Sequence, residues 1–107
     1  MDKAGNTPLH WAARGGHVDV FKLLLEKNPA LNATNKLGDT PLHSAAWAGS
    51  LPIVQLLLSC SDIKAGITNK GGDTPLNLAK NDQVAAVLLQ FTGQGGGKDL
   101  LDDGEDD

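Results

Sequence analysis

Apolar residues recur in pairs, four positions apart, in two stretches of the chain. The first stretch places Val20-Phe21 and Leu24-Leu25 in this pattern, and the second places Ile53-Val54 and Leu57-Leu58. Residues at positions i, i+1, i+4 and i+5 fall on one side of a helix. We therefore expect two outer helices with an apolar stripe, the first of them over residues 18–27.

A shorter pattern, Thr-Pro-Leu, occurs three times, and its first two copies precede the two apolar stretches. Its threonines are Thr7, Thr40 and Thr74, spaced 33 and then 34 residues apart. Threonine is a good N-cap because its hydroxyl accepts a hydrogen bond from the first turn, and proline fits the first helical position. The alanines that follow let a neighbouring helix approach closely. The pattern predicts an inner helix, near residues 8–15 in the first copy, within a unit that occurs three times.

Glycine and proline mark the expected turns between these helices. Gly5, Gly38 and Gly72 each precede a threonine by two residues, where a turn can need a positive φ. Gly15-Gly16 breaks the first inner helix. Asn28-Pro29 ends the first outer helix, because the residue before proline is pushed out of the α region.

The third copy is shorter than the other two. Threonine lies 17 residues before Leu24 and Leu57 but only 14 before Leu88, and Asn77 replaces a histidine. A terminal repeat is expected to be atypical because one of its faces meets water. We divide the chain into repeat 1 (1–34), repeat 2 (35–68), a shortened C-terminal cap repeat (69–91), and a glycine-rich linker with an acidic tail (92–107).

The first copy has no polar cap before it. Trp11 aligns with Ser44 and Leu78, and we expect it to be buried in the core. A solenoid needs a polar cap at each end. Three explanations stay open: the chain is a fragment of a longer one, its first face meets a partner, or that face meets another copy of the chain.

The negative charge of the chain lies in its tail. The net charge is −4, yet residues 1–91 contain eight basic and seven acidic side chains. We therefore expect no nucleic-acid partner and no binding to an anionic membrane. We interpret Lys98–Asp107 as a solubilising tail or as a docking peptide centred on Leu100-Leu101.

Cysteine usage and hydropathy favour a cytoplasmic protein. Cys60 is the only cysteine, so the chain forms no internal disulfide, which fits a reducing compartment. No stretch reaches the ~18 apolar residues of a transmembrane helix. We also expect no signal peptide, since the first repeat follows Met1 closely.

The residues that could carry chemistry have simpler structural interpretations. His10 and His43 lack a cysteine or carboxylate at metal-ligand spacing, and each imidazole can share hydrogen bonds with its threonine. Asp39, His43 and Ser44 lie together without a nucleophile elbow or an oxyanion loop. Cys60 is best interpreted as a small hydrophobic residue. We predict no catalytic residue, no metal and no cofactor.

Several motifs resemble those of known families. Thr-Pro-Leu-His at 7–10 and 40–43, with the 33–34-residue period, resembles the ankyrin-repeat family over about 90 residues. That resemblance implies an all-α solenoid of about three repeats that binds other proteins and is not an enzyme. Segments 35–40 and 53–58 also resemble the ankyrin half of the osteoclast-stimulating factor family.

That second resemblance implies an intracellular signalling adaptor, linked indirectly to osteoclast formation and bone resorption. The family joins an SH3 domain to its ankyrin repeats. The SH3 domain and the first ankyrin repeat are absent from this chain, so a claim to proline-rich ligands does not carry over. A generic ankyrin scaffold or inhibitor protein, or a self-associating ankyrin fragment, is the alternative.

The resemblance to ankyrin repeats also places a binding site. In that family the turn tips and the exposed side of the inner helices form a concave face. Trp47 takes the place that Arg14 holds in repeat 1, a place usually exposed, and with Leu37 it forms a candidate hot spot. Carried over residue by residue, the predicted protein-binding residues are Lys3, Ala4, Asn6, Arg14, Lys36, Leu37, Asp39, Trp47, Lys70, Asp73 and Asn81.

Overall fold

Six helices make up the described part of the chain. The computed structural model describes residues 3–27 and 29–95, and side chains as far as residue 91. The helices are α1 (Pro8–Gly15), α2 (Val18–Leu25), α3 (Pro41–Ala48), α4 (Leu51–Leu58), α5 (Pro75–Leu78) and α6 (Asp82–Gly95). The all-α prediction is confirmed.

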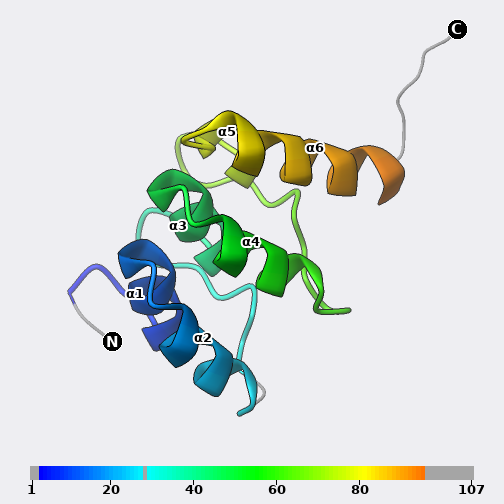
Figure 1. Cartoon of the computed structure of the whole chain (residues 1–107). Coiled ribbons are helices and arrows are strands. Elements are labelled where there is room, and N and C mark those ends of the chain that lie inside the picture. The colour runs from blue at the N-terminus through cyan, green and yellow to red at the C-terminus, as the bar shows by residue number, and fades with distance from the viewer. Residues whose placement is uncertain (1–2, 28, 96–107) are drawn as a thin grey trace, which may run out of the picture.

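The helices form two layers. Figure 1 shows α1, α3 and α5 side by side in an inner layer, and α2, α4 and α6 side by side in an outer one. Each inner helix packs against the outer helix that follows it, so the chain is a stack of three helix pairs. A stack of this kind has two ends, and each end exposes one helix pair on one side.

Each inner helix begins as its Thr-Pro pair predicts. The hydroxyls of Thr7, Thr40 and Thr74 accept hydrogen bonds from the backbone N–H three residues on, at 3.4, 3.3 and 3.3 Å. Gly16 and Gly49 then end α1 and α3 in the left-handed conformation. The prediction of an inner helix over residues 8–15 is therefore confirmed.

The core agrees with the predicted stripe in repeat 2 and differs from it in repeat 1. Ile53, Val54 and Leu57 are fully buried, whereas in the stripe of repeat 1 only Phe21 is fully buried, and Val20 is 50% exposed. The reason is the position of each helix pair in the stack. Repeat 2 is covered by repeat 1, whereas no residue in the described part of the chain covers the far side of repeat 1.

The prediction that Trp11 belongs to the core is wrong for the same reason. Its side chain is 58% exposed at the open end of the stack.

The prediction that the first outer helix extends to Lys27 is also wrong, because α2 ends at Leu25. The Lys27 N–H donates to the Leu24 carbonyl three residues back at 3.1 Å, so the chain leaves the helix through a tighter 3₁₀-type turn.

The third repeat differs from its prediction at both helices. The inner helix α5 has only four residues, so Asn81 lies beyond it and not on its exposed side. The outer helix α6 continues to Gly95, past the predicted boundary at 91, and residues 92–95 are helical where a flexible linker was expected. No proline interrupts this run, and each further residue adds a backbone hydrogen bond. The predicted acidic tail and Asn28 lie outside the described residues.

One tip glycine is required both by its backbone angle and by a close neighbour. Gly38 has φ +82°, and a Cβ at this position would stand 2.8 Å from the backbone nitrogen of Lys70 in the next tip. An L side chain here would therefore strain its own backbone and also push two tips apart.

We expect Gly38→Ala to lower the free energy of unfolding by about 1–3 kcal/mol, because both strains act together. Gly66→Ala is the matched control, since a Cβ there meets nothing within 4 Å. Urea unfolding followed by circular dichroism measures both. If Gly38→Ala unfolds at the wild-type urea concentration, the close approach of the tips is wrong.

Candidate protein-binding site

Two buried histidines join consecutive repeats. The His10 Nδ1 accepts from the Thr7 N–H at 3.0 Å, and its Nε2 lies 2.7 Å from the Asp39 carbonyl in the next repeat. Because an N–H can only donate, Nδ1 accepts and Nε2 carries the hydrogen that it donates to Asp39. His43 repeats this arrangement with the Asp73 carbonyl at 2.9 Å. We call these two linkages the histidine bridges.

Asn77 shows what the third repeat keeps of this arrangement. Its Oδ1 accepts from the Thr74 N–H at 2.9 Å, as a histidine Nδ1 does in the other repeats. An asparagine side chain is too short to reach a further repeat as well. The replacement of histidine by Asn77 therefore fits the last repeat of the stack, which has no described successor to bridge.

The turn tips are held together by asparagine side chains. The Oδ1 of Asn35 accepts from the N–H groups of Leu37 and Asp39 at 2.9 and 3.0 Å, and its Nδ2 donates to Asn6 at 2.8 Å. Asn69 repeats the pattern and donates to the Asp39 carboxylate at 2.8 Å. Asn6 and Asp39, both predicted as binding residues, thus also link one tip to the next.

Backbone hydrogen bonds complete the ladder of tips. The Lys36 N–H donates to the Ala4 carbonyl at 2.8 Å, and the Lys70 N–H donates to the Leu37 carbonyl at 2.9 Å. The three predicted lysines, one on each tip, are exposed, and the tips of repeats 2 and 3 also carry Asp39 and Asp73, which are half-buried.

The inner helices contribute an aromatic and a guanidinium group to the same side. Trp47 on α3 is 54% exposed, as predicted, and the Arg14 guanidinium carbon on α1 lies 5.2 Å from its ring centroid. This is cation–π distance. Leu37, 64% exposed, lies on the tip of repeat 2. The pairing holds the Trp47 ring in place at the surface.

A groove of about 280 Å³ lies between the tips and the inner helices, and we call it the concave groove. It brings together six of the predicted binding residues. Lys3, Lys36, Lys70, Asp73 and Asn81 do not line it. Its lining is Ala4, Asn6, Arg14, Asn35, Leu37, Asp39, His43, Ser44, Trp47 and Leu78.

Asn81 has a structural position. Its Oδ1 accepts from the Val84 N–H at 2.9 Å at the start of α6, and its Nδ2 donates to the Gly49 carbonyl at 3.4 Å. It therefore caps one helix and ties the third repeat to the second. Sequence alignment gave it the place of Trp47 because the deletion in the third repeat could not be located to a single residue.

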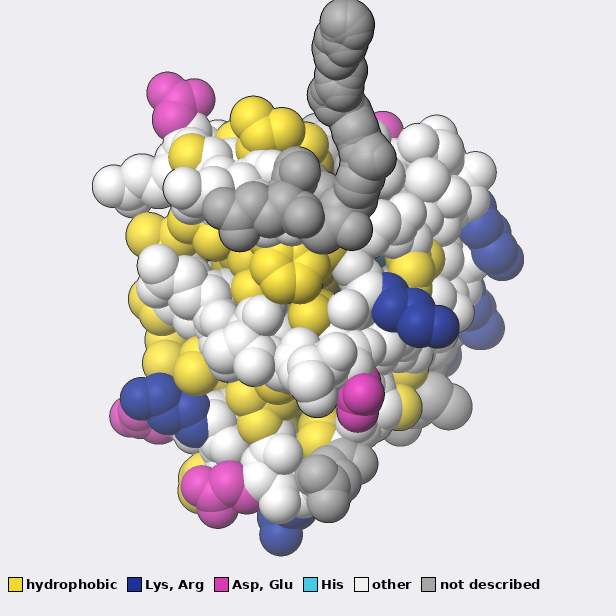
Figure 2. All heavy atoms as spheres, turned by 90° about the vertical axis from the view of Figure 1, so that its right-hand side faces the viewer, with side chains coloured by type: hydrophobic (Ala, Val, Ile, Leu, Met, Phe, Trp, Pro, Cys, Tyr) yellow, Lys and Arg dark blue, Asp and Glu magenta, His cyan; other side chains and the backbone are white. Residues whose placement is uncertain are grey.

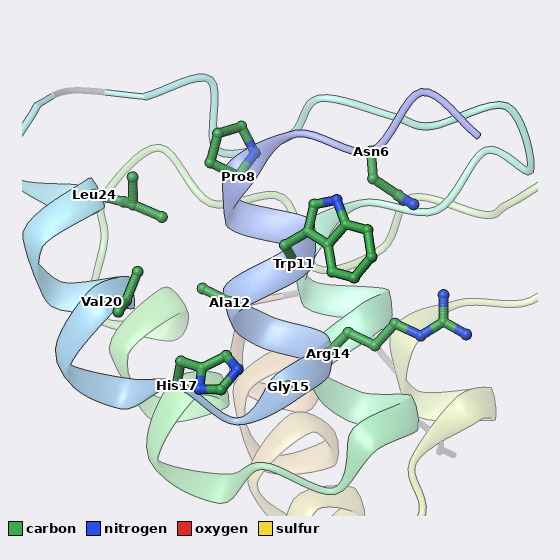
Figure 3. A pocket seen from close by; sticks show the side chains of 9 residues that line it. All are labelled: Asn6, Pro8, Trp11, Ala12, Arg14, Gly15, His17, Val20 and Leu24. Carbon is green, nitrogen blue, oxygen red and sulfur yellow. The ribbon is translucent and has the colours of Figure 1, made fainter. Parts of the chain in front are cut away.

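A larger hollow, about 810 Å³, lies at the open end of the stack, on the face of repeat 1 that the sequence left either to a missing part of a longer chain, to a partner or to another copy of the chain. Figure 3 shows it between α1 and α2, with Trp11 projecting from α1 and both Val20 and Leu24 pointing in from α2. Only the absence of a polar cap before repeat 1 signalled it in the sequence. We call this surface the N-terminal face.

The side of the molecule formed by the ends of the outer helices is less distinctive. Figure 2 shows hydrophobic side chains there in separate patches, divided by polar ones. A hollow of about 430 Å³ between α4 and α6 is lined by both kinds, among them Gln55, Leu58 and Phe91. This mixture gives it no clear preference for a ligand.

The chemical alternatives find little support in the geometry. Both ring nitrogens of His43 bind other groups, Thr40 and the Asp73 carbonyl, and so neither serves Ser44 as a base. Residues 3–27 and 29–91 contain no cluster of three metal-ligating side chains.

Burial, followed by the charge of Asp62, raises the pKa of the Cys60 thiol. No helix in the described part is long and apolar enough to cross a membrane.

These features define a class of protein, and comparison with known families agrees. A family model of ankyrin repeats in three copies matches residues 1–69. The chain belongs to the ankyrin-repeat family, whose members are typically non-catalytic modules that bind other proteins.

Two relatives share a name. The chain is 51% identical over 94 residues to osteoclast-stimulating factor 1 of Danio rerio, covering 87% of this chain and 44% of the relative. It is 63% identical over 27 residues to osteoclast-stimulating factor 1 of Monopterus albus, covering 25% of this chain and 13% of the relative. The chain thus spans less than half the length of the relatives it matches.

The raised pKa of Cys60 predicts slow alkylation. Only the thiolate reacts, and burial beside Asp62 disfavours it, so at neutral pH iodoacetamide should modify the folded chain several-fold more slowly than the same chain in urea. Mass spectrometry against time measures both rates. Faster modification of the folded chain would instead identify Cys60 as an activated thiol.

Proposed function

We propose that this chain is the protein-binding module of a cytoplasmic signalling adaptor, and that it holds its partner in the concave groove. The exposed Trp47, fixed by Arg14 and close to Leu37, is the observation that carries the proposal. Membership of the ankyrin-repeat family supports binding in general. Similarity to proteins named osteoclast-stimulating factor supports an adaptor with an indirect role in osteoclast formation.

The groove is suited to binding because its walls are fixed before a partner arrives. The asparagine and backbone hydrogen bonds hold three tips in one ladder, and the histidine bridges fix that ladder on the inner helices. A surface ordered in advance loses little conformational entropy on binding. Rigid display of side chains is therefore the mechanism that we propose.

The composition of the groove indicates the kind of segment that fits it. Trp47 and Leu37 offer apolar area, and exposed tryptophan is enriched at binding hot spots. Lys36 and the equivalent lysines stand on the tips beside this area. A peptide segment with an apolar side chain next to acidic residues would match both features, since rim charges of opposite sign speed association and fix orientation.

We expect Trp47→Ala to weaken partner binding by about 2 kcal/mol, or ~30-fold in Kd, and to leave folding intact. Trp11→Ala is the matched control, since the two tryptophans are similarly exposed at 54% and 58%. Pulldown from cell lysate with the wild type identifies a partner by mass spectrometry. Titration calorimetry with that purified partner then gives Kd for each variant.

The two variants distinguish two surfaces. Loss of affinity only in Trp47→Ala supports the concave groove. Unchanged affinity in Trp47→Ala together with a loss in Trp11→Ala would reject the groove and place the partner on the N-terminal face.

A further inference from the structure

Arg14 brings a positive charge to the concave groove without an anionic partner among the described residues. Its side chain is exposed, and apart from the contact with Trp47 it makes no hydrogen bond or ion pair within the described part of the chain. Figure 3 shows its guanidinium turned away from Val20 and Leu24. A guanidinium carries five N–H donors in a planar fork, so contact with one ring leaves donors for another group.

The carboxylate that lines the groove does not serve Arg14. Asp39 is half-buried, and its carboxylate accepts from the Asn69 side chain at 2.8 Å within the ladder of tips. Within the described residues, Asp39 forms no ion pair with Arg14. A carboxylate supplied by a partner would therefore be the first anion that Arg14 binds, and it would gain charge-assisted hydrogen bonds.

We propose that Arg14 determines the specificity of the concave groove by binding an Asp or Glu side chain of the partner segment whose apolar residue packs on Trp47. This inference rests on the proposed function, because it needs a partner in that groove. A guanidinium fork matches a carboxylate in two parallel hydrogen bonds. The contact with Trp47 restricts the fork before the partner arrives, so less side-chain entropy is lost on binding.

The backbone of the tips favours a side-chain carboxylate over the carboxylate at a chain end. A terminal carboxylate is commonly captured by a nest of backbone N–H groups. The N–H groups of Leu37 and Asp39, at the edge of the groove, are already bonded to the Asn35 Oδ1 at 2.9 and 3.0 Å. The occupant that fits is therefore an internal segment of a partner protein.

The separation of Arg14 and Trp47 sets the spacing of the two partner residues. The guanidinium carbon lies 5.2 Å from the ring centroid. An extended segment advances ~3.3 Å per residue, so this separation corresponds to about one or two residues of the partner. We therefore expect the acidic residue within two positions of the apolar one.

Selection of a phage-displayed library of random peptides on the immobilised chain tests this expectation. A parallel selection on Trp47→Ala removes the peptides that bind elsewhere. Among the Trp47-dependent peptides, Asp or Glu beside the apolar residue should exceed its frequency in the library. Displayed peptides are fused at their carboxyl end, so the carboxylates that they offer belong to side chains.

A double-mutant cycle on the tightest of these peptides isolates the contact. Arg14→Gln and the matching amide substitution in the peptide should each raise Kd ~10-fold, and the two together no more than ~10-fold, because each removes the same contact. Lys36→Gln is the matched control: it removes an exposed charge on a tip outside the groove lining and should change Kd less than ~3-fold. Fluorescence anisotropy of the labelled peptide measures Kd, and circular dichroism checks that each variant is folded.

The outcomes separate this inference from the proposed function. Trp47-dependent peptides without an acidic preference, additive losses in the cycle, or an equal loss in Lys36→Gln would overturn the role of Arg14 and leave the concave groove as the binding site. A selection that yields no Trp47-dependent peptide would reject the groove, and this inference with it.

Discussion

The hydrogen bonds of two buried imidazoles hold the stack together. Each histidine accepts from the threonine that begins its own helix and donates to a carbonyl in the tip of the next repeat. One side chain therefore fixes a helix start and the position of the following repeat at once. His10 and His43 are 1% and 0% exposed, so these bonds act in a low dielectric, where losing a partner costs most.

The candidate binding surface depends on this linkage. Because the carbonyls of Asp39 and Asp73 are held by the histidines, the tips stand at fixed positions along the inner helices. The asparagine ladder then joins tip to tip, and Trp47 rests under Arg14 on the neighbouring helix. The same repeated packing leaves the N-terminal face uncovered by the described residues.

Features that lie within one repeat could be predicted from the sequence. The Thr-Pro starts and the breaks at glycine follow from local chemistry, and the exposed Trp47 followed from alignment of the copies. Features decided by a neighbour could not be predicted. Trp11 and Val20 have the pattern of core residues but stand where the described chain supplies no neighbour. The asparagine ladder joins residues about 30 positions apart, and no local pattern signals it.

The most direct test of the histidine bridges is the free energy of unfolding of His43→Asn, measured by urea denaturation beside Asn77→His. Asparagine at position 43 can keep the threonine bond, as Asn77 does, but cannot reach the Asp73 carbonyl. The bridge predicts that His43→Asn loses about 2 kcal/mol, from the lost hydrogen bond of a buried side chain and a cavity, and that Asn77→His changes stability by less than ~0.5 kcal/mol. Equal and small effects of the two substitutions would contradict it.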